Sequence, residues 1–343
     1  MGTLLEFKEL IKNFYGKYDS YLISIGKFII ALCAFMMINI KLGQMHLLNN
    51  PLIVIILALV CSFLPLNAIV LIGSAFIIGH LYALSLEAFL VGTGILVVML
   101  LLYFGIAPKE SLAIILAPIA CGLNIPCAVP LVLGLVRTPF AGIGIAFGTI
   151  GYYTVAVLDD KAKGVTATAK DATEAMVQKL TGLLDSILKN PEMIITVITM
   201  LAVIIMVYVI RRMAIRYAWS IAILVGTFIF LISTLMGGMV MGTGKNFLGV
   251  ILGTAVSAAI AFFVKLFLFE VDYKRTQKVQ FEDDDYYYFV KAVPKTVVKQ
   301  RKKEIHQEEP VRNSRNEGRS AAERPKRVRR GEPGRSDLDI KDY

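Results

Sequence analysis

Long apolar runs constrain the fold of this chain more than any other feature of its sequence. A helix crosses the apolar core of a bilayer with about 20 residues, and five uninterrupted runs are close to that length or longer: Tyr21–Ile40, Leu84–Phe104, Met193–Ile210, Ala218–Met236 and Phe247–Phe269. The 343 residues are 56% hydrophobic and only 18% charged, whereas soluble domains are about 45–50% apolar and about 25% charged. The sequence therefore predicts an all-α polytopic membrane protein and excludes a soluble enzyme.

Three further apolar runs complete the set, and prolines interrupt two of them. They are Pro51–Gly79, Ser111–Val136 and the glycine-rich run Phe140–Leu158. Pro65 and Asn67 interrupt the first run, and Pro118, Pro126 and Pro130 interrupt the second. Because a proline-broken run forms either one kinked helix or two half-helices, we expect about eight transmembrane helices, with seven or nine as alternatives.

Arginines in a short loop predict the orientation in the membrane. The loop Arg211–Arg216 holds three arginines, and the segment after the last run is also basic, so both are expected in the cytoplasm. Eight crossings then place both termini in the cytoplasm of a multi-pass plasma-membrane protein, with His80 and Arg137 in short inside loops. The segment Asp159–Pro191 is expected outside.

These assignments divide the chain into six parts. They are a cytoplasmic N-terminus (1–20), transmembrane helices 1–5 (21–158), an extracytoplasmic amphipathic-helix segment (159–191), transmembrane helices 6–8 (192–270), a cytoplasmic juxtamembrane β-hairpin (271–298) and a disordered basic tail (299–343). The first run is too long for the apolar region of a cleaved signal peptide. We therefore expect it to remain as the first transmembrane helix.

The extracytoplasmic segment predicts an amphipathic helix. Asp171 and Glu174 have the spacing of a capping box. Apolar residues then recur at helical spacing up to Ile187, and Asn190-Pro191 ends the pattern. Two arrangements stay open: the helix lies on the outer leaflet, or it packs against the membrane body or a protein partner.

The cytoplasmic C-terminal part carries two candidate contact surfaces. Val279–Phe281 is predicted to pair with Tyr287–Val293 across an acidic turn, and since an isolated hairpin is marginal in water we expect it to contact a protein partner. Residues 299–343 have the composition of a disordered chain. Their closely spaced basic residues are predicted to contact anionic inner-leaflet lipid or a partner: Arg324, Lys326, Arg327, Arg329 and Arg330. Nucleic acid is disfavoured, because no aromatic residues for base stacking accompany them.

Similarity between the two proline-broken runs is the basis of the functional hypothesis. The spacing of Leu57-Ala58, Cys61, Pro65 and Gly73 recurs about sixty residues later, with two single-residue insertions, as Leu116-Ala117, Cys121, Pro126 and Gly134. Paired broken helices are typical of transporters, whose freed backbone groups bind substrate near the midplane; chance similarity between apolar sequences is the alternative. The candidate transport path consists of Pro65, Asn67, Glu87, Pro118, Asn124, Pro126 and Pro130.

Glu87 belongs to this set because ionisable residues are scarce in the apolar runs. Lys27 and Lys265 lie near helix ends and can extend to the interface. Glu87 is near the start of its own helix, so it either lines the path or also reaches the interface. This scarcity of carboxylates disfavours an ion-coupled carrier.

Small residues at four-residue spacing predict close helix packing. Gly144 and Gly148 form one pair, and Gly249, Gly253 and Ser257 form a longer stripe. Such residues let membrane helices approach closely within one chain, or between two copies of it.

Motifs for catalysis and for bound groups are missing. The sequence contains no HExxH, Gly-x-Ser-x-Gly or Walker pattern, and its four cysteines form no CxxC pair. We therefore expect no enzymatic activity, no cofactor and no metal.

The juxtamembrane stretch KVQFEDDDYYYFVKAVPK, joined to this apolar body, resembles that of uncharacterised multi-pass membrane proteins of Gram-positive anaerobes that are loosely labelled permease. The resemblance implies no assigned activity or site. The inside loops near His80, Arg137 and Arg211 are too short for the coupling helices of an ABC-transporter permease. Two hypotheses follow: a small-molecule permease with its path at the broken helices, or a membrane scaffold or complex subunit that docks partners through the outside helix and the cytoplasmic tail.

Overall fold

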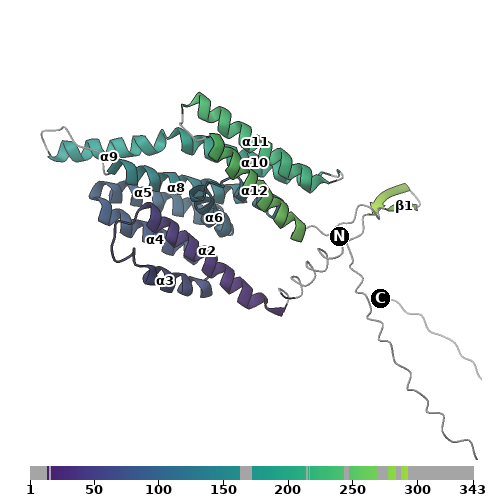
Figure 1. Cartoon of the computed structure of the whole chain (residues 1–343), viewed down its shortest axis with the longest axis horizontal. Helices are drawn as coiled ribbons and strands as arrows, with labels where there is room; N and C mark the ends of the chain where they lie inside the picture. The colour runs from purple at the N-terminus through teal and green to yellow at the C-terminus, as the bar shows by residue number, and fades with distance from the viewer. Residues whose placement is uncertain are drawn as a thin grey trace, which may run out of the picture. The chain divides into compact units, whose positions relative to one another are not determined.

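The computed structural model describes residue 14, residues 17–162, 172–213, 215, 217–242 and 247–268, and the backbone of two strands. Its elements are Asp19–Lys41 (α2), Pro51–Phe63 (α3), Leu66–Leu84 (α4), Leu86–Ile106 (α5), Ser111–Gly122 (α6), Ala128–Val136 (α7), Ala141–Ala162 (α8), Ala172–Leu188 (α9), Pro191–Arg212 (α10), Ala218–Val240 (α11), Phe247–Leu268 (α12), Gln277–Glu282 (β1) and Tyr287–Ala292 (β2). Figure 1 shows their arrangement.

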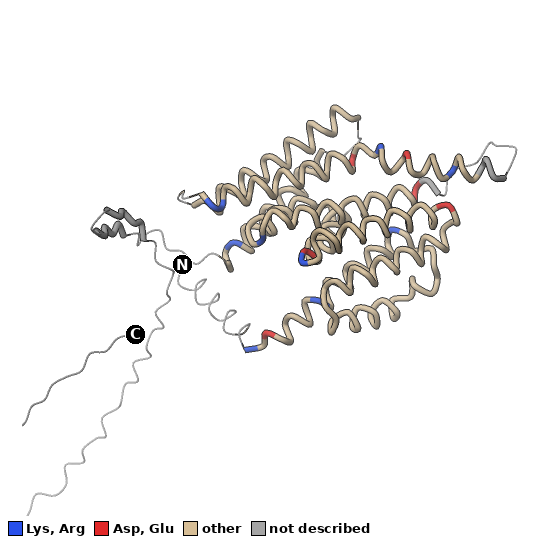
Figure 2. Tube along the Cα trace, turned by 180° about the vertical axis from the view of Figure 1, so that it is seen from behind, with Lys and Arg blue, Asp and Glu red and all other residues tan. Residues whose placement is uncertain are grey.

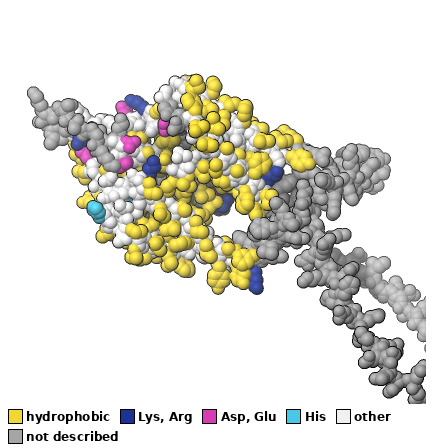
Figure 3. All heavy atoms as spheres, in the orientation of Figure 1, with side chains coloured by type: hydrophobic (Ala, Val, Ile, Leu, Met, Phe, Trp, Pro, Cys, Tyr) yellow, Lys and Arg dark blue, Asp and Glu magenta, His cyan; other side chains and the backbone are white. Residues whose placement is uncertain are grey.

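Seven helices of the described part are long and apolar enough to cross a membrane: α2, α4, α5, α8, α10, α11 and α12. Figure 2 places most charged residues of the described chain at or near helix ends. Figure 3 shows that hydrophobic side chains cover much of the visible face of the body. A surface of this kind suits lipid better than water. The fold is therefore that of a multi-pass membrane protein in contact with the bilayer.

The chain reverses at Pro65, between α3 and α4. The Phe35 ring lies 5.4 Å from that of Phe76, and Asn39 Oδ1 is 2.8 Å from His80 Nε2, so α4 runs parallel to α2. Lys27 Nζ donates to the Leu64 carbonyl oxygen at 3.1 Å, which places the end of α3 beside the first half of α2. With 13 residues, α3 is about 20 Å long.

The remaining long helices alternate in direction. Gly92 of α5 lies against both Leu81 and Leu158, Thr149 Oγ1 lies 3.3 Å from Met200 Sδ, and Lys265 Nζ donates to Ser220 Oγ. We call the end of the helices at Lys41, Ser85 and Pro191 the α9 end. The opposite end, at Ile106, Arg137 and Arg212, is called the Arg137 end. The start of α2 and the end of α12 both lie at the Arg137 end.

The structure divides the two proline-interrupted runs differently from the sequence prediction. The run Pro51–Gly79 is two helices of opposite direction, not one crossing, whereas Ser111–Val136 is a hairpin of α6 and α7 that enters and leaves at the Arg137 end. Hydropathy reports how apolar a segment is and carries no information on whether the chain continues or turns back at a proline. Each run contributes no net crossing where one was predicted, so the number of net crossings falls by two and stays even. The start of α2 and the end of α12 therefore remain on the same side.

His80 consequently lies at the opposite end from the one predicted. Its Nδ1 accepts a hydrogen bond from the Met45 backbone N–H at 3.3 Å, in the loop that follows α2. The prediction was wrong because it treated Pro51–Gly79 as one crossing. The short loop at Arg137 lies at the same end as the segment at Arg211, as predicted, and the Arg211 side chain donates to the Arg137 carbonyl oxygen.

The amphipathic helix α9 packs on the body of its own chain. Leu183 and Ile187 are each 2% exposed and belong to one apolar cluster with Ala88, Val91 and Leu158. This contact selects one of the two arrangements left open by the sequence.

The two strands pair antiparallel, with Val279 opposite Val290 and Phe281 opposite Tyr288. The predicted hairpin had its second strand end at Val293, one residue beyond β2. The predicted disordered tail lies outside the described residues.

Candidate functional site

The site begins with a re-entrant hairpin, which we define as α6, residues 123–127 and α7. Asn124 sits at its tip with a φ of 58°, a left-handed conformation that Asn tolerates better than most residues. The Ile125 N–H donates to the Ala120 carbonyl oxygen at 2.9 Å, which closes the end of α6. All residues of α7 from Ala128 to Leu135 are buried except Val132, so this short helix lies inside the protein.

The tip packs against α12. The Ser257 hydroxyl donates to the Gly253 carbonyl oxygen at 2.7 Å and lies 3.3 Å from the Ile125 carbonyl oxygen. The Asn124 carbonyl oxygen occupies the space that a Cβ atom at Gly253 would need. Glycine at position 253 is therefore what lets the tip reach α12.

Charged groups hold the base of the hairpin at the Arg137 end. Arg137 Nη1 lies 3.7 Å from Glu110 Oε2, which joins the end of α7 to the start of α6. Arg211 of α10 donates through Nη2 to the Arg137 carbonyl oxygen at 2.7 Å and through Nη1 to that of Leu135. A cation at the carboxyl end of a helix satisfies its free carbonyl groups and complements its dipole.

A polar cavity of about 250 Å³ lies between the hairpin tip and the α9 end. It is lined by residues of α6, the tip, α8, α10, α11 and α12: Cys121, Asn124, Pro126, Tyr152, Tyr153, Glu192, Thr196, Phe230, Thr234, Gly249, Val250 and Thr254. Glu192 and Gly249 belong to the first turns of α10 and α12. The cavity thus extends from the level of these first turns to the tip.

Residues with hydroxyl groups line this cavity, and the hydroxyls of two of them, Tyr153 and Thr196, contact each other. The Thr196 hydroxyl donates to the Glu192 carbonyl oxygen at 2.7 Å, and the Tyr153 hydroxyl oxygen is 3.1 Å from Thr196 Oγ1. The Thr254 hydroxyl donates to the Val250 carbonyl oxygen at 2.6 Å. Thr234 is 6% exposed, and its Oγ1 has no hydrogen-bond partner among the described residues.

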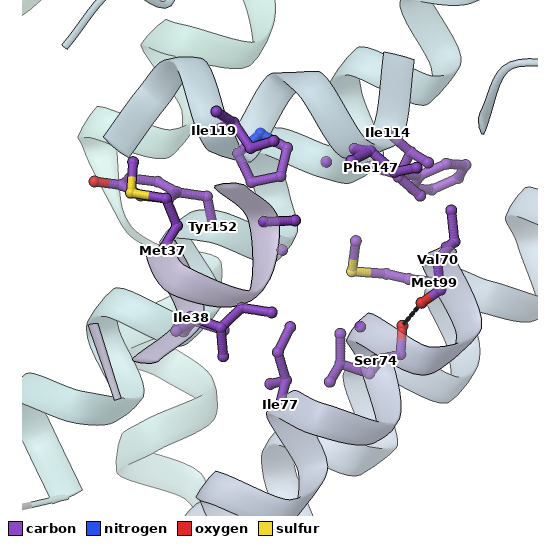
Figure 4. Close-up of a pocket in the computed structure, with 18 of the residues that line it drawn as sticks. Met37, Ile38, Val70, Ser74, Ile77, Met99, Ile114, Ile119, Phe147 and Tyr152 are labelled. Atoms are coloured by element: carbon purple, nitrogen blue, oxygen red, sulfur yellow. Dashed lines mark hydrogen bonds between the residues drawn. The ribbon is translucent and has the colours of Figure 1, made fainter. Parts of the chain in front are cut away.

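A second cavity, of about 140 Å³, is almost entirely apolar. Figure 4 shows side chains of α2, α4, α5, α6 and α8 around it, with the Ser74 hydroxyl turned toward the Val70 carbonyl oxygen, at 2.8 Å. The hydrogen of that hydroxyl is thus used within its own helix. Tyr152 lines both cavities.

The structure gathers only part of the predicted path. Asn124 and Pro126 line the polar cavity, and Pro118 lies inside α6 beside the apolar cavity. Pro130 is buried in α7.

The other predicted path residues lie elsewhere. Pro65 is the N-cap residue of α4, and Asn67 Oδ1 accepts a hydrogen bond from the Tyr103 hydroxyl at 3.0 Å. Glu87 Oε1 is 3.3 Å from Lys179 Nζ of α9, so this carboxylate joins α5 to α9 and lines neither cavity.

The predicted packing residues lie at close contacts, with one exception. A Cβ at Gly144 would lie 2.8 Å from Ala113 Cβ, and one at Gly148 would lie 2.6 Å from the Ile114 carbonyl oxygen. Gly249 lines the polar cavity. The basic residues from Arg324 to Arg330 lie outside the described residues.

Sequence reasoning missed six polar residues of the cavity: Tyr152, Tyr153, Glu192, Thr196, Thr234 and Thr254. Each lies in an apolar helix at a position that hydropathy treats as ordinary. The available signal was the set of threonines in α10, α11 and α12, but threonine commonly satisfies its hydroxyl within its own helix. Only the packing of four helices, α8, α10, α11 and α12, shows that these residues share one cavity.

The fold and cavity define the class of a multi-pass membrane protein with a helical hairpin re-entering its helix bundle. No three His, Cys, Asp or Glu side chains of the described segments gather to hold a metal ion. The chain matches no protein-family model, no curated protein and no solved structure.

Proposed function

We propose that this protein is a permease for small polar solutes and that the polar cavity above the hairpin tip is its binding site. The observation that carries the proposal is the cavity itself. It holds hydroxyls, an amide and a carboxylate inside an otherwise apolar bundle. Polar groups within membrane helices are costly and mark substrate pathways.

The direction of the two broken segments supports transport. The chain turns back at Pro65 on the way from the α9 end and at residues 123–127 on the way from the Arg137 end. The two segments with similar sequence spacing therefore run in opposite directions through the bundle. Inverted repeats of this kind, with binding sites at broken helices, are a feature of secondary transporters.

The hairpin tip places irregular backbone beside the cavity. The carbonyl oxygens of Ala120 and Cys121 at the end of α6 accept from the N–H groups of Ile125 and Asn124 within the tip. Irregular backbone at this depth is tolerated in membrane proteins where it is buried in protein or lines a cavity. The tip meets both conditions, since it packs on α12 and lines the polar cavity.

The proposed orientation places the Arg137 end in the cytoplasm of a plasma-membrane protein. The loop with Arg211 and Arg212 lies at this end, and short arginine-rich loops are retained on the cytoplasmic side. Both termini are then cytoplasmic, and α9 and the polar cavity lie on the outer side of the hairpin tip.

The packing of α9 favours the permease over the scaffold. Leu183 and Ile187, the most buried residues of α9, contact the body of the same chain. Part of the apolar face of α9 is thus engaged within the chain, whereas Val177, Leu184 and Leu188 are exposed. The hairpin β1–β2 and the basic tail keep their predicted roles as contacts for a protein partner or anionic lipid.

Solute flux through proteoliposomes tests the proposal. Vesicles with and without protein are mixed with glycerol, glycine or ethanolammonium chloride, and re-swelling is followed by stopped-flow light scattering. We expect protein-dependent re-swelling with at least one solute, and its loss in Thr254→Trp, which fills the cavity. Val256→Trp is the matched control, because Val256 is 50% exposed on the same helix.

Equal flux in the wild-type protein and Thr254→Trp would contradict the proposal, as would no protein-dependent flux with any of the three solutes. Thr234→Val serves as a second variant, since it removes a hydroxyl with little change in volume. Truncation after Val298 distinguishes the permease from the alternative function, a membrane scaffold. A permease keeps its flux without the tail, whereas a scaffold loses a co-purifying partner.

A further inference from the structure

Three hydroxyl hydrogens of the polar cavity, those of Thr196, Thr254 and Tyr153, have acceptors within the protein. Thr196 and Thr254 each donate their one hydroxyl hydrogen to the carbonyl oxygen four residues earlier. Thr196 Oγ1 therefore accepts in its contact with Tyr153, and the tyrosine hydroxyl donates. In this arrangement the three groups present oxygen lone pairs, which are hydrogen-bond acceptors, to a ligand.

The other lining groups also favour a ligand that is a hydrogen-bond donor and a cation. Glu192 brings a carboxylate, and no Lys, Arg or His is among the described residues that line the cavity. Tyr152, Tyr153 and Phe230 add three aromatic rings, whose faces attract cations. The Lys41 ammonium lies 5.4 Å from the centre of the Tyr152 ring, and Lys41 lines the apolar cavity and not the polar one.

Thr234 supplies an independent sign that a ligand belongs here. Its hydroxyl is buried without a partner in the described chain. A buried hydroxyl without a hydrogen-bond partner destabilises the folded protein. A ligand or water in the cavity that bonds to it would remove this destabilisation.

We propose that the polar cavity selects small organic ammonium ions, a substrate class that rests on the permease function proposed above. The ammonium N–H groups donate to the oxygens of Tyr153, Thr254 and the Glu192 carboxylate. The carbon skeleton contacts the aromatic rings. At about 250 Å³ the cavity exceeds the roughly 30 Å³ that one water occupies in the liquid, so there is room for an organic body beside the charged group.

Charge-selective labelling of a cysteine in the cavity tests this selectivity without a known substrate. Val250→Cys places a thiol on the lining and leaves every polar lining group in place. The full-length variant in detergent is treated with aminoethyl methanethiosulfonate, a primary ammonium, or with sulfonatoethyl methanethiosulfonate, an anion. Labelling at position 250 is measured by mass spectrometry, and each rate is divided by the rate of the same reagent with free 2-mercaptoethanol.

We expect the corrected rate of the cation to exceed that of the anion by about tenfold or more, because a carboxylate near a partly dry site separates the two by over about 1.4 kcal/mol. Glu192→Gln should reduce the ratio. Asp185→Asn is the matched control, since Asp185 lies in α9 with a 63% exposed side chain and does not line the cavity. It should leave the ratio unchanged.

A ratio near one, a preference for the anion, or a ratio that Glu192→Gln leaves unchanged would overturn the proposal. Absence of reaction with both reagents would overturn it together with access to the cavity. Flux in proteoliposomes with a ratio near one would leave the permease and remove the ammonium selectivity. A high ratio without flux would leave a cation-selective binding site and remove transport.

Discussion

The carbonyl oxygen of Asn124 lies against Gly253 of α12, in the space that any side chain at position 253 would need. This contact fixes the tip of the re-entrant hairpin and so defines the inner end of the polar cavity. Because Asn124 contributes backbone, which cannot rotate away as a side chain can, the contact allows a sharp test.

Gly253→Ala should destabilise the protein. The added methyl group must displace the hairpin tip, and overpacking of this kind costs about 1–3 kcal/mol. The measurement is the melting temperature in detergent. Gly94→Ala is the control, because a Cβ at Gly94 of α5 meets nothing within 4 Å; equal melting temperatures for the two variants would contradict the tip contact.

Arg211→Gln should loosen the base of the hairpin. Arg211 donates to the carbonyl oxygens of Leu135 and Arg137, and hydrogen bonds to charged groups contribute about 1.5–3 kcal/mol. We expect a lower melting temperature than for Arg212→Gln, which removes the neighbouring exposed arginine. Two variants of the same stability would show that Arg211 does not hold the hairpin.

Glu87→Gln should leave solute flux intact and weaken the attachment of α9. The Glu87 carboxylate pairs with Lys179 at 3.3 Å and lines neither cavity. Such a pair contributes about 0–1 kcal/mol, so thermolysin, which cleaves beside apolar residues, should cleave within α9 faster while flux persists. The double variant Glu87→Lys with Lys179→Glu, which reverses the pair, should restore the resistance of α9 to proteolysis. Loss of flux in Glu87→Gln would show instead that Glu87 belongs to the transport path.

The position of Glu87, which pairs with Lys179 and lines neither cavity, shows which features of the structure the sequence does not predict. Hydropathy and arginine distribution predict a membrane body, the existence of α9 and the common side of the Arg137 and Arg211 loops. They do not predict the direction of the chain after Pro65 or at residues 123–127, because both outcomes bury the same apolar residues. Direction depends on contacts between distant residues, such as Asn39 with His80.

The sequence also does not predict which side chains line the polar cavity, for a physical reason. Asn124 and Pro126 were recognisable because a break in a helix frees backbone groups. Thr196, Thr234 and Thr254 were not, since a single threonine in an apolar helix is compatible with lipid contact, helix packing or a binding site. Their common location follows from the way α10, α11 and α12 pack around the tip.

Cysteine labelling in intact cells should establish the orientation. Thr181→Cys lies on the exposed face of α9, and Met213→Cys lies beyond the end of α10, where Met213 is 48% exposed. An impermeant thiol reagent should label position 181 in intact cells and position 213 only after permeabilisation. The reverse pattern would place the Arg137 end outside.

The central claim, that the polar cavity is reached from the α9 end, is tested most directly by labelling Thr234→Cys in intact cells. The reagent is the impermeant cation trimethylammonioethyl methanethiosulfonate, and Ile232→Cys on the same helix, 39% exposed, is the control outside the cavity. We expect position 234 to react alongside Thr181→Cys, and position 232 to stay unlabelled. Labelling of position 181 with none at position 234 would contradict the account.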